Sequence, residues 1–252
     1  MNHTTGSDTA IVSVITPVLN EATRLCKALD SLAKQQGVAI EHIIVDGGST
    51  DTTLSVATQY RDSAPYPVKI LTDVDGGVYP ALNAGIDASS GKYIATLHAN
   101  DSFAIDDALA RSIELLESTH TDLSFADLHY TNAAGRRVRY YSGAKFKPER
   151  LLDGFMPPHP TIVARRKLFE AIGDYNPTYT IAADYDWLCR AMLIHKATCV
   201  YLPVDMVEMS PGGISGLWKN RLWFTNLDKL HSLKDNNLPA SPIRLLKRYL
   251  YL

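Results

Sequence analysis

Short apolar runs alternate with segments of helical periodicity through the first hundred residues of this 252-residue chain. The apolar runs have the length of strands, and each is followed by a polar or glycine-rich turn; they cover residues 11–16, 40–45, 68–71 and 93–97. Between the first two runs, Leu25, Leu29 and Leu32 recur at spacings of four and three, which is typical of a helix with one buried face. Strands linked by helical crossovers form a parallel sheet. The sequence therefore predicts an α/β fold with several strand ends at one edge.

The helices of this first part have recognisable starts. Asn20 is suited to cap the first helix, which Gly37 ends, and Thr50 or Asp51 is suited to cap a second that runs to about Tyr60. A third helix is expected over 79–88.

The rest of the chain has a more mixed pattern. We expect helices over 105–118, 166–172, 184–194, 218–230 and 243–252, strands over 123–125 and 197–204, a hairpin over 128–140 and a flexible loop over 210–216. No repeat, low-complexity tract or linker interrupts this pattern. A single domain over 1–252 is the simplest organisation.

The composition narrows the class of protein. With 46% hydrophobic and 21% charged residues, the chain is typical of a globular protein. Its formal net charge of -2 argues against a broad nucleic-acid-binding surface. Cys26, Cys189 and Cys199 lack zinc-type spacing and are expected as buried thiols in a reducing compartment. Without an apolar signal-peptide core or a run of roughly 20 apolar residues, we expect a cytoplasmic protein.

A polar cluster follows the strand expected over 93–97. His98, Asn100, Asp101 and Ser102 stand where an apolar strand ends abruptly. Ligands of open α/β sheets bind at the carboxyl ends of strands. An aspartate there can hold a hard cation such as Mg²⁺ or Mn²⁺. The alternative is that Asp101 or Ser102 only caps the helix that starts near Ile105.

Six motifs, taken in order, resemble family 2 glycosyltransferases. They are V-S-V-I-T-P-V-L-N-E at 12–21, V-D-G-G-S-T-D-T-T at 45–53, D-G-G-V-Y-P-A-L-N-A-G at 75–85, L-H-A-N-D-S-F at 97–103, P-H-P-T at 158–161 and I-A-A-D-Y-D-W-L-C-R at 181–190. The resemblance is greatest to bacterial members that build capsule, exopolysaccharide or O-antigen units. It implies the GT-A fold and transfer of a sugar, with inversion, from a nucleotide diphosphate donor. It also implies a nucleotide-sugar-binding half over about 11–103, an acceptor and catalytic half over about 104–216, and C-terminal helices over 217–252.

The resemblance assigns donor-binding roles to residues near the strand ends. These residues are Pro17, Asn20, Glu21, Asp46, Asp75, Gly76, Asn83, Asn100 and Arg190. Asp46 corresponds to a carboxylate that accepts a hydrogen bond from the donor base, and a uracil-type N–H would suit it; the alternative is that Asp46 only organises the turn. Asp75 and Gly76 correspond to a segment near the ribose and diphosphate, although an ordinary turn would have the same composition.

The metal site implied by the resemblance consists of Asp101 and His159, with Mn²⁺ or Mg²⁺ as the ion. Many relatives have a second carboxylate where this chain has Asn100, and the loss of one negative charge should weaken divalent binding. An amide oxygen remains available, and diphosphate oxygens supply much of a Mg²⁺ shell. The alternative for His159 is a structural histidine in a proline-rich turn.

Asp184 corresponds to the general base of the family. Inversion requires a base on the acceptor side, which removes the hydroxyl proton as that oxygen attacks the sugar. Asp186 lies two residues on and is the main competitor for this role. Residues i and i+2 of a helix point to different faces, and motif position favours Asp184. The usual glutamate before the base is replaced by Ala183, as in some polysaccharide-assembly relatives.

The implied partners are a nucleotide-sugar donor, with UDP as the expected nucleotide, and a glycan or polyprenyl-linked acceptor. The basic and apolar segment 243–252 suits contact with an anionic membrane surface, or packing on the domain or on a second subunit. Two other functions stay open at this point. One is a nucleotidyltransferase, and the other is a sugar-nucleotide-binding subunit without catalytic activity.

Overall fold

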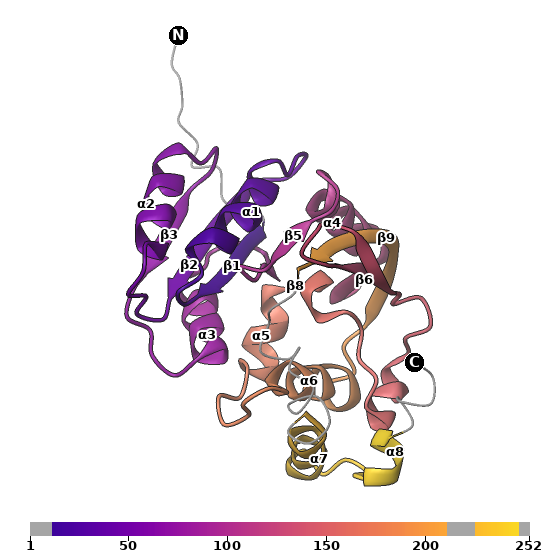
Figure 1. Ribbon diagram of the computed structural model, residues 1–252. Helices are drawn as coiled ribbons and strands as arrows, with labels where there is room; N and C mark the ends of the chain where they lie inside the picture. Colours follow the sequence, from indigo (N-terminus) through magenta and orange to yellow (C-terminus); the bar gives the residue numbers. More distant parts are fainter. Residues whose placement is uncertain (1–11, 211–224, 247–252) are drawn as a thin grey trace.

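The computed structural model describes residues 12–210 and 225–246. Within these ranges, a nine-stranded sheet forms the centre of the molecule and helices cover both of its faces (Figure 1). The strand order is β3-β2-β1-β4-β8-β6-β9-β5, and β7 pairs with β6 outside this path. The predicted α/β class is confirmed.

The first four strands are parallel, as predicted. They are β1 (Val12–Val18), β2 (Ile40–Asp46), β3 (Val68–Leu71) and β4 (Tyr93–Thr96). β1 pairs with β2 and β4, and β2 pairs with β3. Their carboxyl ends therefore meet at one edge of the sheet. The pairing of Pro17 with Val45 and of Val18 with Asp46 extends β1 and β2 beyond their predicted ends, so Pro17 lies in a strand and not in the following turn.

The second half of the sheet is mixed. Its strands are β5 (Asp101–Phe103), β6 (Leu123–Thr131), β7 (Arg137–Tyr141), β8 (Val163–Arg165) and β9 (Cys199–Met209). β8 is antiparallel to β4 and to β6, and this joins the two halves. The predicted hairpin is confirmed as β6 and β7. β9 continues five residues past the predicted end because it pairs with both β6 and β5.

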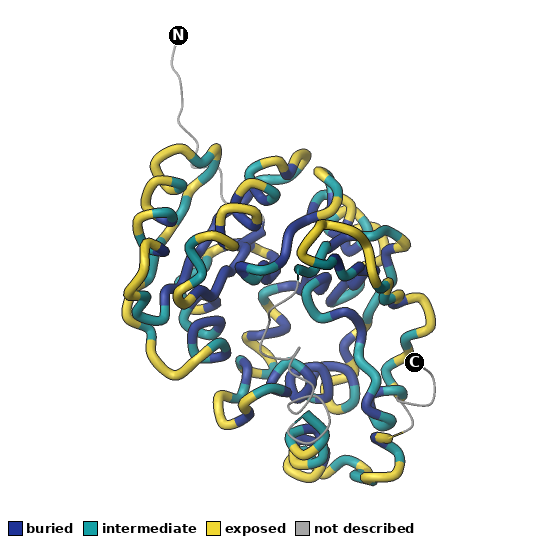
Figure 2. Tube along the Cα trace, in the orientation of Figure 1, coloured by how far each residue is buried: buried dark blue, intermediate teal, exposed yellow. Residues whose placement is uncertain are grey.

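Helices lie in one layer on each face. One face carries α1 (Ala22–Ala33), α2 (Thr53–Ser63) and α4 (Ala108–Thr119); the other carries α3 (Val78–Ala88), α5 (Arg166–Ile172) and α6 (Ala183–Leu188). β1 serves both layers, since Val14 packs toward α1 and α4 whereas Ile15 packs toward α3. Buried chain accordingly runs through the centre, and exposed residues follow the outer helix faces (Figure 2). Gly85 permits the close packing of α3, because a Cβ there would lie 2.4 Å from Ile15 Cγ2.

Two short 3-10 helices and one π-helical turn lie in the second half of the described chain. They are η1 (Pro148–Asp153), η2 (His159–Thr161) and η3 (Cys189–Ile194). The helix predicted over 184–194 is present as α6 followed directly by η3, and its Trp187, Leu188 and Met192 are buried. Cys189 is buried as predicted, but Cys26 is exposed because it lies on the outer face of α1.

Three helix starts differ from the prediction. The capping position of α2 is Thr52, and not Thr50 or Asp51. Asn20 does not cap α1; its φ of +52° is left-handed, and Glu21 occupies the capping position. α4 begins at Ala108 and not near Ile105, because residues 101–103 form a strand.

The C-terminal part contributes α7 (Thr225–Asp235) and α8 (Pro242–Leu246), which lie beyond α6 (Figure 1). The loop predicted over 210–216, apart from Ser210, the start of the helix predicted over 218–230 and the end of the one predicted over 243–252 lie outside the described residues. No helix in the described ranges is long and apolar enough to cross a membrane.

Candidate active site

The loops that follow β1 and β2 are joined by hydrogen bonds around Asn20. The Asn20 side-chain oxygen accepts from the Thr50 N–H (2.8 Å), and the Asn20 N–H donates to the Ser49 hydroxyl (2.9 Å). The Gly47 N–H donates to the Val18 carbonyl (2.9 Å). Asn20 therefore shapes the edge of the sheet with its side chain, and this use explains why it is not a helix cap.

Asp46 ends β2 at this edge with a fully buried carboxylate. Its Oδ2 accepts from the N–H groups of Gly48 (3.0 Å) and Ser49 (2.9 Å), so Asp46 does organise the turn. Its Oδ1 is buried and has no partner among the described residues. Because a buried acceptor without a partner is costly, this oxygen is available for a donor group of a bound ligand.

The N-terminus of α3 lies beside the end of β2. The Val74 N–H donates to the Asp46 carbonyl (3.1 Å), which ties the loop after β3 to this strand. Asp75, Gly76 and Gly77 are exposed, and both glycines have positive φ angles (+104° and +98°) that side chains rarely adopt. Free N–H groups at a helix N-terminus can bind phosphate oxygens. Pro17 and Glu21 flank the same edge, and Glu21 pairs with Arg24 at 3.0 Å.

Asp101 lies in β5, directly after the carboxyl end of β4. The helix-capping interpretation of Asp101 is wrong, because the residue pairs with Met209 of β9 and α4 starts seven residues later. Its side chain is buried, and burial raises the pKa of the carboxyl to about 7, although nearby Lys27 opposes the shift. The neighbouring Asn100 Oδ1 is also buried without a partner in the described part of the chain. Two oxygen ligands for a hard cation are thus adjacent.

His159 of η2 interacts electrostatically with His98, in the loop after β4, and with Asp184 of α6. Burial and the nearby His159 together lower the pKa of His98 to about 4. Burial also lowers the pKa of His159, whereas Asp184 raises it. The His159 Nε2 lies 3.3 Å from the Tyr175 hydroxyl, so the ring has a structural partner as well. The fold therefore brings the predicted base and the predicted metal-binding histidine together.

Asp184 and Asp186 are clearly distinguished by their contacts. Asp184 is half-buried, and within the described ranges its side chain accepts one hydrogen bond, from the following Tyr185 N–H (2.7 Å). Asp186 is buried, and both of its oxygens are occupied: Oδ2 by Arg190 Nε (2.8 Å), and Oδ1 by Ser232 (2.9 Å) and Asn236 (2.8 Å). These contacts favour a structural role for Asp186.

Two predicted donor-binding side chains are used inside the protein. Arg190 pairs with Asp186 and donates to the carbonyls of Ile172 (2.6 Å) and Asp174 (2.5 Å). Asn83 donates to the Tyr175 carbonyl (2.8 Å) and accepts from the Tyr175 N–H (3.1 Å). With their polar groups engaged in this way, both residues stabilise the fold and are not free to bind a nucleotide.

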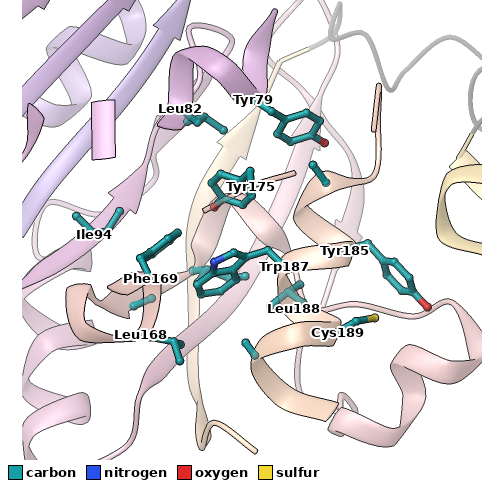
Figure 3. Packing of buried hydrophobic residues seen from close by; sticks show 14 of the residues in the cluster. Tyr79, Leu82, Ile94, Leu168, Phe169, Tyr175, Tyr185, Trp187, Leu188 and Cys189 are labelled. Carbon is teal, nitrogen blue, oxygen red and sulfur yellow. The ribbon is translucent and has the colours of Figure 1, made fainter. Parts of the chain in front are cut away.

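Tyr79 and Tyr175 lie next to the candidate base and were missed by the sequence interpretation. Their rings lie 5.9 Å apart, and Tyr175 also contacts Phe169 and Trp187 (Figure 3). Burial raises the pKa of both phenols, and the nearby charge of Asp184 raises it further. Tyr79 lies within the motif at 75–85, which was a usable signal; nothing in the sequence marks Tyr175.

Metal ligands are few in the part of the chain that the structure describes. No group of three or more His, Cys, Asp or Glu side chains there is arranged to hold a metal ion. Asp101 and His159 therefore do not form a complete site by themselves. Oxygens of a bound ligand would have to supply the rest of a coordination shell.

A polar cleft of about 600 Å³ opens next to β5, between α1 and β9. Two of the basic side chains that line the cleft form ion pairs with acidic side chains that also line it: Lys27 with Glu208, and Arg137 with Asp205. Asp46, Asp184 and His159 do not line it. This cleft is therefore separate from the candidate active site.

The model of one protein family, Glycosyl transferase family 2, matches residues 13–182 of the chain. That span includes the loops after β1 and β2, the N-terminus of α3, β5 and η2, but not α6 and η3, which carry Asp184 and Arg190. This chain belongs to that family. It is therefore a glycosyltransferase, and among the functions left open by the sequence the transferase is the one that the family supports.

The chain is similar to several curated glycosyltransferases. It is 35% identical over 204 residues to a PGL/p-HBAD biosynthesis glycosyltransferase of Mycobacterium tuberculosis, with 81% of this chain and 78% of the relative covered. It is 30% identical over 147 residues to the succinoglycan biosynthesis protein ExoO of Rhizobium meliloti, with 58% of this chain and 41% of ExoO covered.

Solved glycosyltransferase structures share the fold of this chain. Residues 1–349 of S. aureus TarS match with a TM-score of 0.72 at 19% identity, covering 96% of this chain and 72% of that one. The mannosyltransferase PcManGT of Pyrobaculum calidifontis, in complex with GDP-Man and Mn²⁺, matches with a TM-score of 0.68 at 17% identity, covering 97% and 70%. The predicted GT-A fold of this glycosyltransferase is confirmed.

Proposed function

We propose that this glycosyltransferase moves a sugar from a nucleoside diphosphate donor, UDP-linked in the first instance, to a hydroxyl group of a glycan or lipid-linked acceptor, with inversion at the anomeric carbon. The observation that carries the proposal is the position of Asp184. Its carboxylate has no ion pair among the described residues, and it interacts with His159. A free carboxylate is what a general base on the acceptor side requires.

Asp46 recognises the donor base in this proposal. Its buried, unpartnered Oδ1 would accept a hydrogen bond from an N–H of the base, and uracil and guanine both have such a group. Oδ2 is held by the turn, so the free oxygen is fixed in direction. The ribose and diphosphate would then lie toward Asp75 and Gly76 at the N-terminus of α3.

The residues at the end of β4 fit a hard divalent cation. Asp101 supplies a carboxylate and Asn100 a buried amide oxygen, neither of which has a protein donor in the described ranges. These are ligands of the kind that Mg²⁺ and Mn²⁺ prefer. When bound, the cation would neutralise charge on the departing diphosphate. His159 would lie beside the cation site and next to Asp184.

Asp184 would take the proton of the acceptor hydroxyl as that oxygen forms its bond to the anomeric carbon. The bond from the same carbon to the diphosphate oxygen breaks on the opposite side, and this displacement gives inversion. The buried aromatic rings of Tyr79, Tyr175 and Trp187 exclude water from behind the base. Exclusion of water favours transfer to the acceptor over hydrolysis of the donor.

The names of relatives suggest the substrate class. Two relatives are named for PGL/p-HBAD biosynthesis and for succinoglycan biosynthesis, and TarS has been solved with UDP and with UDP-GlcNAc. PcManGT, in contrast, was solved with GDP-Man. A UDP-sugar and a surface glycan or glycolipid acceptor are therefore the first substrates to test.

Contact with the inner face of a membrane would bring such an acceptor within reach. On α8, Ile243 is 78% exposed and Leu246 is 53% exposed. Arg244 between them pairs with Asp153 at 2.8 Å, and the sequence continues with Lys247 and Arg248. Sedimentation with vesicles that contain anionic lipid tests this contact. Failure to sediment at low salt would remove it.

A transfer assay tests the proposed reaction. The protein is incubated with Mn²⁺, a panel of UDP- and GDP-sugars, and crude lipid-linked or glycan acceptors, and both nucleoside diphosphate release and the product are measured. We expect transfer from one donor, with the opposite anomeric configuration in the product by NMR. Retention of configuration would contradict the mechanism. Donor binding without any turnover would instead favour a non-catalytic binding subunit.

A further inference from the structure

Helix α3 connects the donor side of the protein to the segment that carries Asp184. Tyr79 and Asn83 lie one turn apart on this helix, so they project from the same face. Both reach residues about one hundred positions later in the chain. Asn83 bonds to Tyr175, and the Tyr79 hydroxyl donates to the carbonyl of Ile181.

The first of these contacts fixes Tyr175. The Asn83 amide pairs with both the N–H and the carbonyl of Tyr175, at 3.1 and 2.8 Å. The Tyr175 ring is buried among Tyr79, Phe169 and Trp187, and its hydroxyl lies 3.3 Å from His159 Nε2 (Figure 3). Backbone, ring and hydroxyl are thus all held.

The second contact belongs to a pair that holds the backbone of Ile181 on both sides of its Cα atom. Its carbonyl accepts from Tyr79 of α3, and its N–H donates to the Asp228 carboxylate of α7 at 3.0 Å. Ile181 stands three residues before Asp184, at the entry to α6. Helix α3 and helix α7 therefore both bond to the backbone of Ile181, which leads directly into the helix that carries Asp184.

We propose that Tyr79 and Asp228 are positioning residues, which set the distance between Asp184 and the donor held at the N-terminus of α3. The inference rests on the proposed function, because it takes Asp184 as the base. Asp75, Gly76 and Tyr79 belong to one short stretch, so any shift of Tyr79 against Ile181 changes the placement of the base relative to the diphosphate. A displacement of about 1 Å can reduce the rate of such a reaction by about 100-fold.

The test compares two hydrogen-bond deletions with a matched control. Tyr79→Phe removes the donor to the Ile181 carbonyl, and Asp228→Leu removes the acceptor of the Ile181 N–H with a side chain of similar size. Tyr60→Phe is the control, because Tyr60 likewise loses one partly buried hydroxyl contact, with Tyr66, at the far edge of the sheet. For each variant, kcat for transfer, the dissociation constant of the donor by calorimetry and the Tm are measured.

We expect kcat to fall about 10- to 100-fold in Tyr79→Phe and Asp228→Leu, whereas the donor dissociation constant changes less than about twofold. The Tm should fall by a similar small amount in all three variants, and Tyr60→Phe should retain kcat. Equal kcat in all four proteins would overturn the inference, as would losses of donor binding that parallel the losses of kcat.

The proposed function fails separately from this inference. If the wild-type protein shows no transfer from any nucleotide sugar, the proposed function is contradicted and the inference falls with it. If the wild type transfers a sugar and Asp184→Asn does not, but Tyr79→Phe is fully active, only the positioning role is contradicted.

Discussion

Asp184 and Asp186 lie two residues apart on α6, yet only Asp186 is bound on both of its oxygens. Arg190 on one side and Ser232 and Asn236 on the other hold its carboxylate, and the pair with Arg190 is largely buried. Asp184 accepts one hydrogen bond from the next peptide group. We therefore expect an Asp→Asn substitution to have different consequences at the two positions.

Asp184→Asn should abolish transfer and leave the fold intact. An amide cannot take the proton of the acceptor, so kcat should fall at least about 100-fold, which is the lower end of general-base contributions. The oxygen that accepts the Tyr185 N–H is retained, so the Tm should stay close to that of the wild type. Calorimetry with the donor should give an unchanged dissociation constant, and a weakened one would contradict the assignment.

Asp186→Asn should instead destabilise the protein. The change leaves the Arg190 guanidinium without its carboxylate in a site where the arginine side chain is 20% exposed. Breaking a buried pair costs about 3–5 kcal/mol, and partial exposure reduces this to roughly 2–4 kcal/mol. Urea unfolding measures the loss. An unchanged midpoint together with lost activity would make Asp186, and not Asp184, the base.

Asp46→Asn should weaken nucleotide binding without disturbing the turn. The remaining amide oxygen can accept from Gly48 and Ser49, but the new NH₂ group would replace Oδ1, the acceptor offered to the base. Donor then faces donor, and we expect a loss of about 10- to 100-fold in UDP affinity, or about 1.4–3 kcal/mol. Calorimetry measures this, with the exposed Asp62→Asn on α2 as the control. Unchanged UDP affinity would show that Asp46 only organises the turn.

Asp101 makes the metal-free protein less stable as the pH rises. Its pKa is about 7 in the folded chain, against an ordinary value of 3.8, so between these values the folded state holds a proton that the unfolded state has lost. Stability is therefore lost between about pH 4 and pH 7, by on the order of 4 kcal/mol when complete. In the presence of a chelator, the Tm difference between Asp101→Asn and the wild type should shift in favour of the variant from pH 4 to pH 8. A constant difference would contradict the raised pKa.

Asn100→Asp restores the second carboxylate that many relatives have. Beside the buried Asp101, the added charge should lower the Tm of the metal-free protein at pH 8 and strengthen Mn²⁺ binding in the presence of UDP by about tenfold, or 1.4 kcal/mol. Calorimetric titration with Mn²⁺ checks the gain, and Asn237→Asp, an exposed position, controls for added charge. Equal Mn²⁺ affinity would place the cation away from Asn100.

The parallel half of the sheet could be predicted closely, because its residues carry local signals. The strand over 68–71 has the predicted bounds. In the second half, the helix over 166–172 has them too, because Gly173 ends its pattern. The strand over 101–103 could not be predicted, because its pairing with Val207 to Met209 is formed by residues more than one hundred positions away. The same long-range pairing displaced the start of α4.

The candidate site was predictable in location but not in the use of each side chain. Motif position selected Asp46, Asp101 and His159, whose roles in ligand binding remain predictions, whereas Asn83 and Arg190 occupy motif positions and bond to the protein itself. Whether a polar side chain faces a ligand or a backbone group depends on tertiary contacts that a motif does not contain. Tyr175 shows the converse, because its role as a contact of His159 and Asn83 has no local pattern.

Calorimetric titration of the protein with UDP, GDP and dTDP, each with and without Mn²⁺, tests the central claim most directly. We predict that one nucleotide, UDP first, binds in a metal-dependent manner, and that Asp46→Asn and Asp101→Asn each weaken this binding. Absence of binding by all three nucleotides, with and without the metal, would contradict a donor site at the carboxyl ends of the parallel strands.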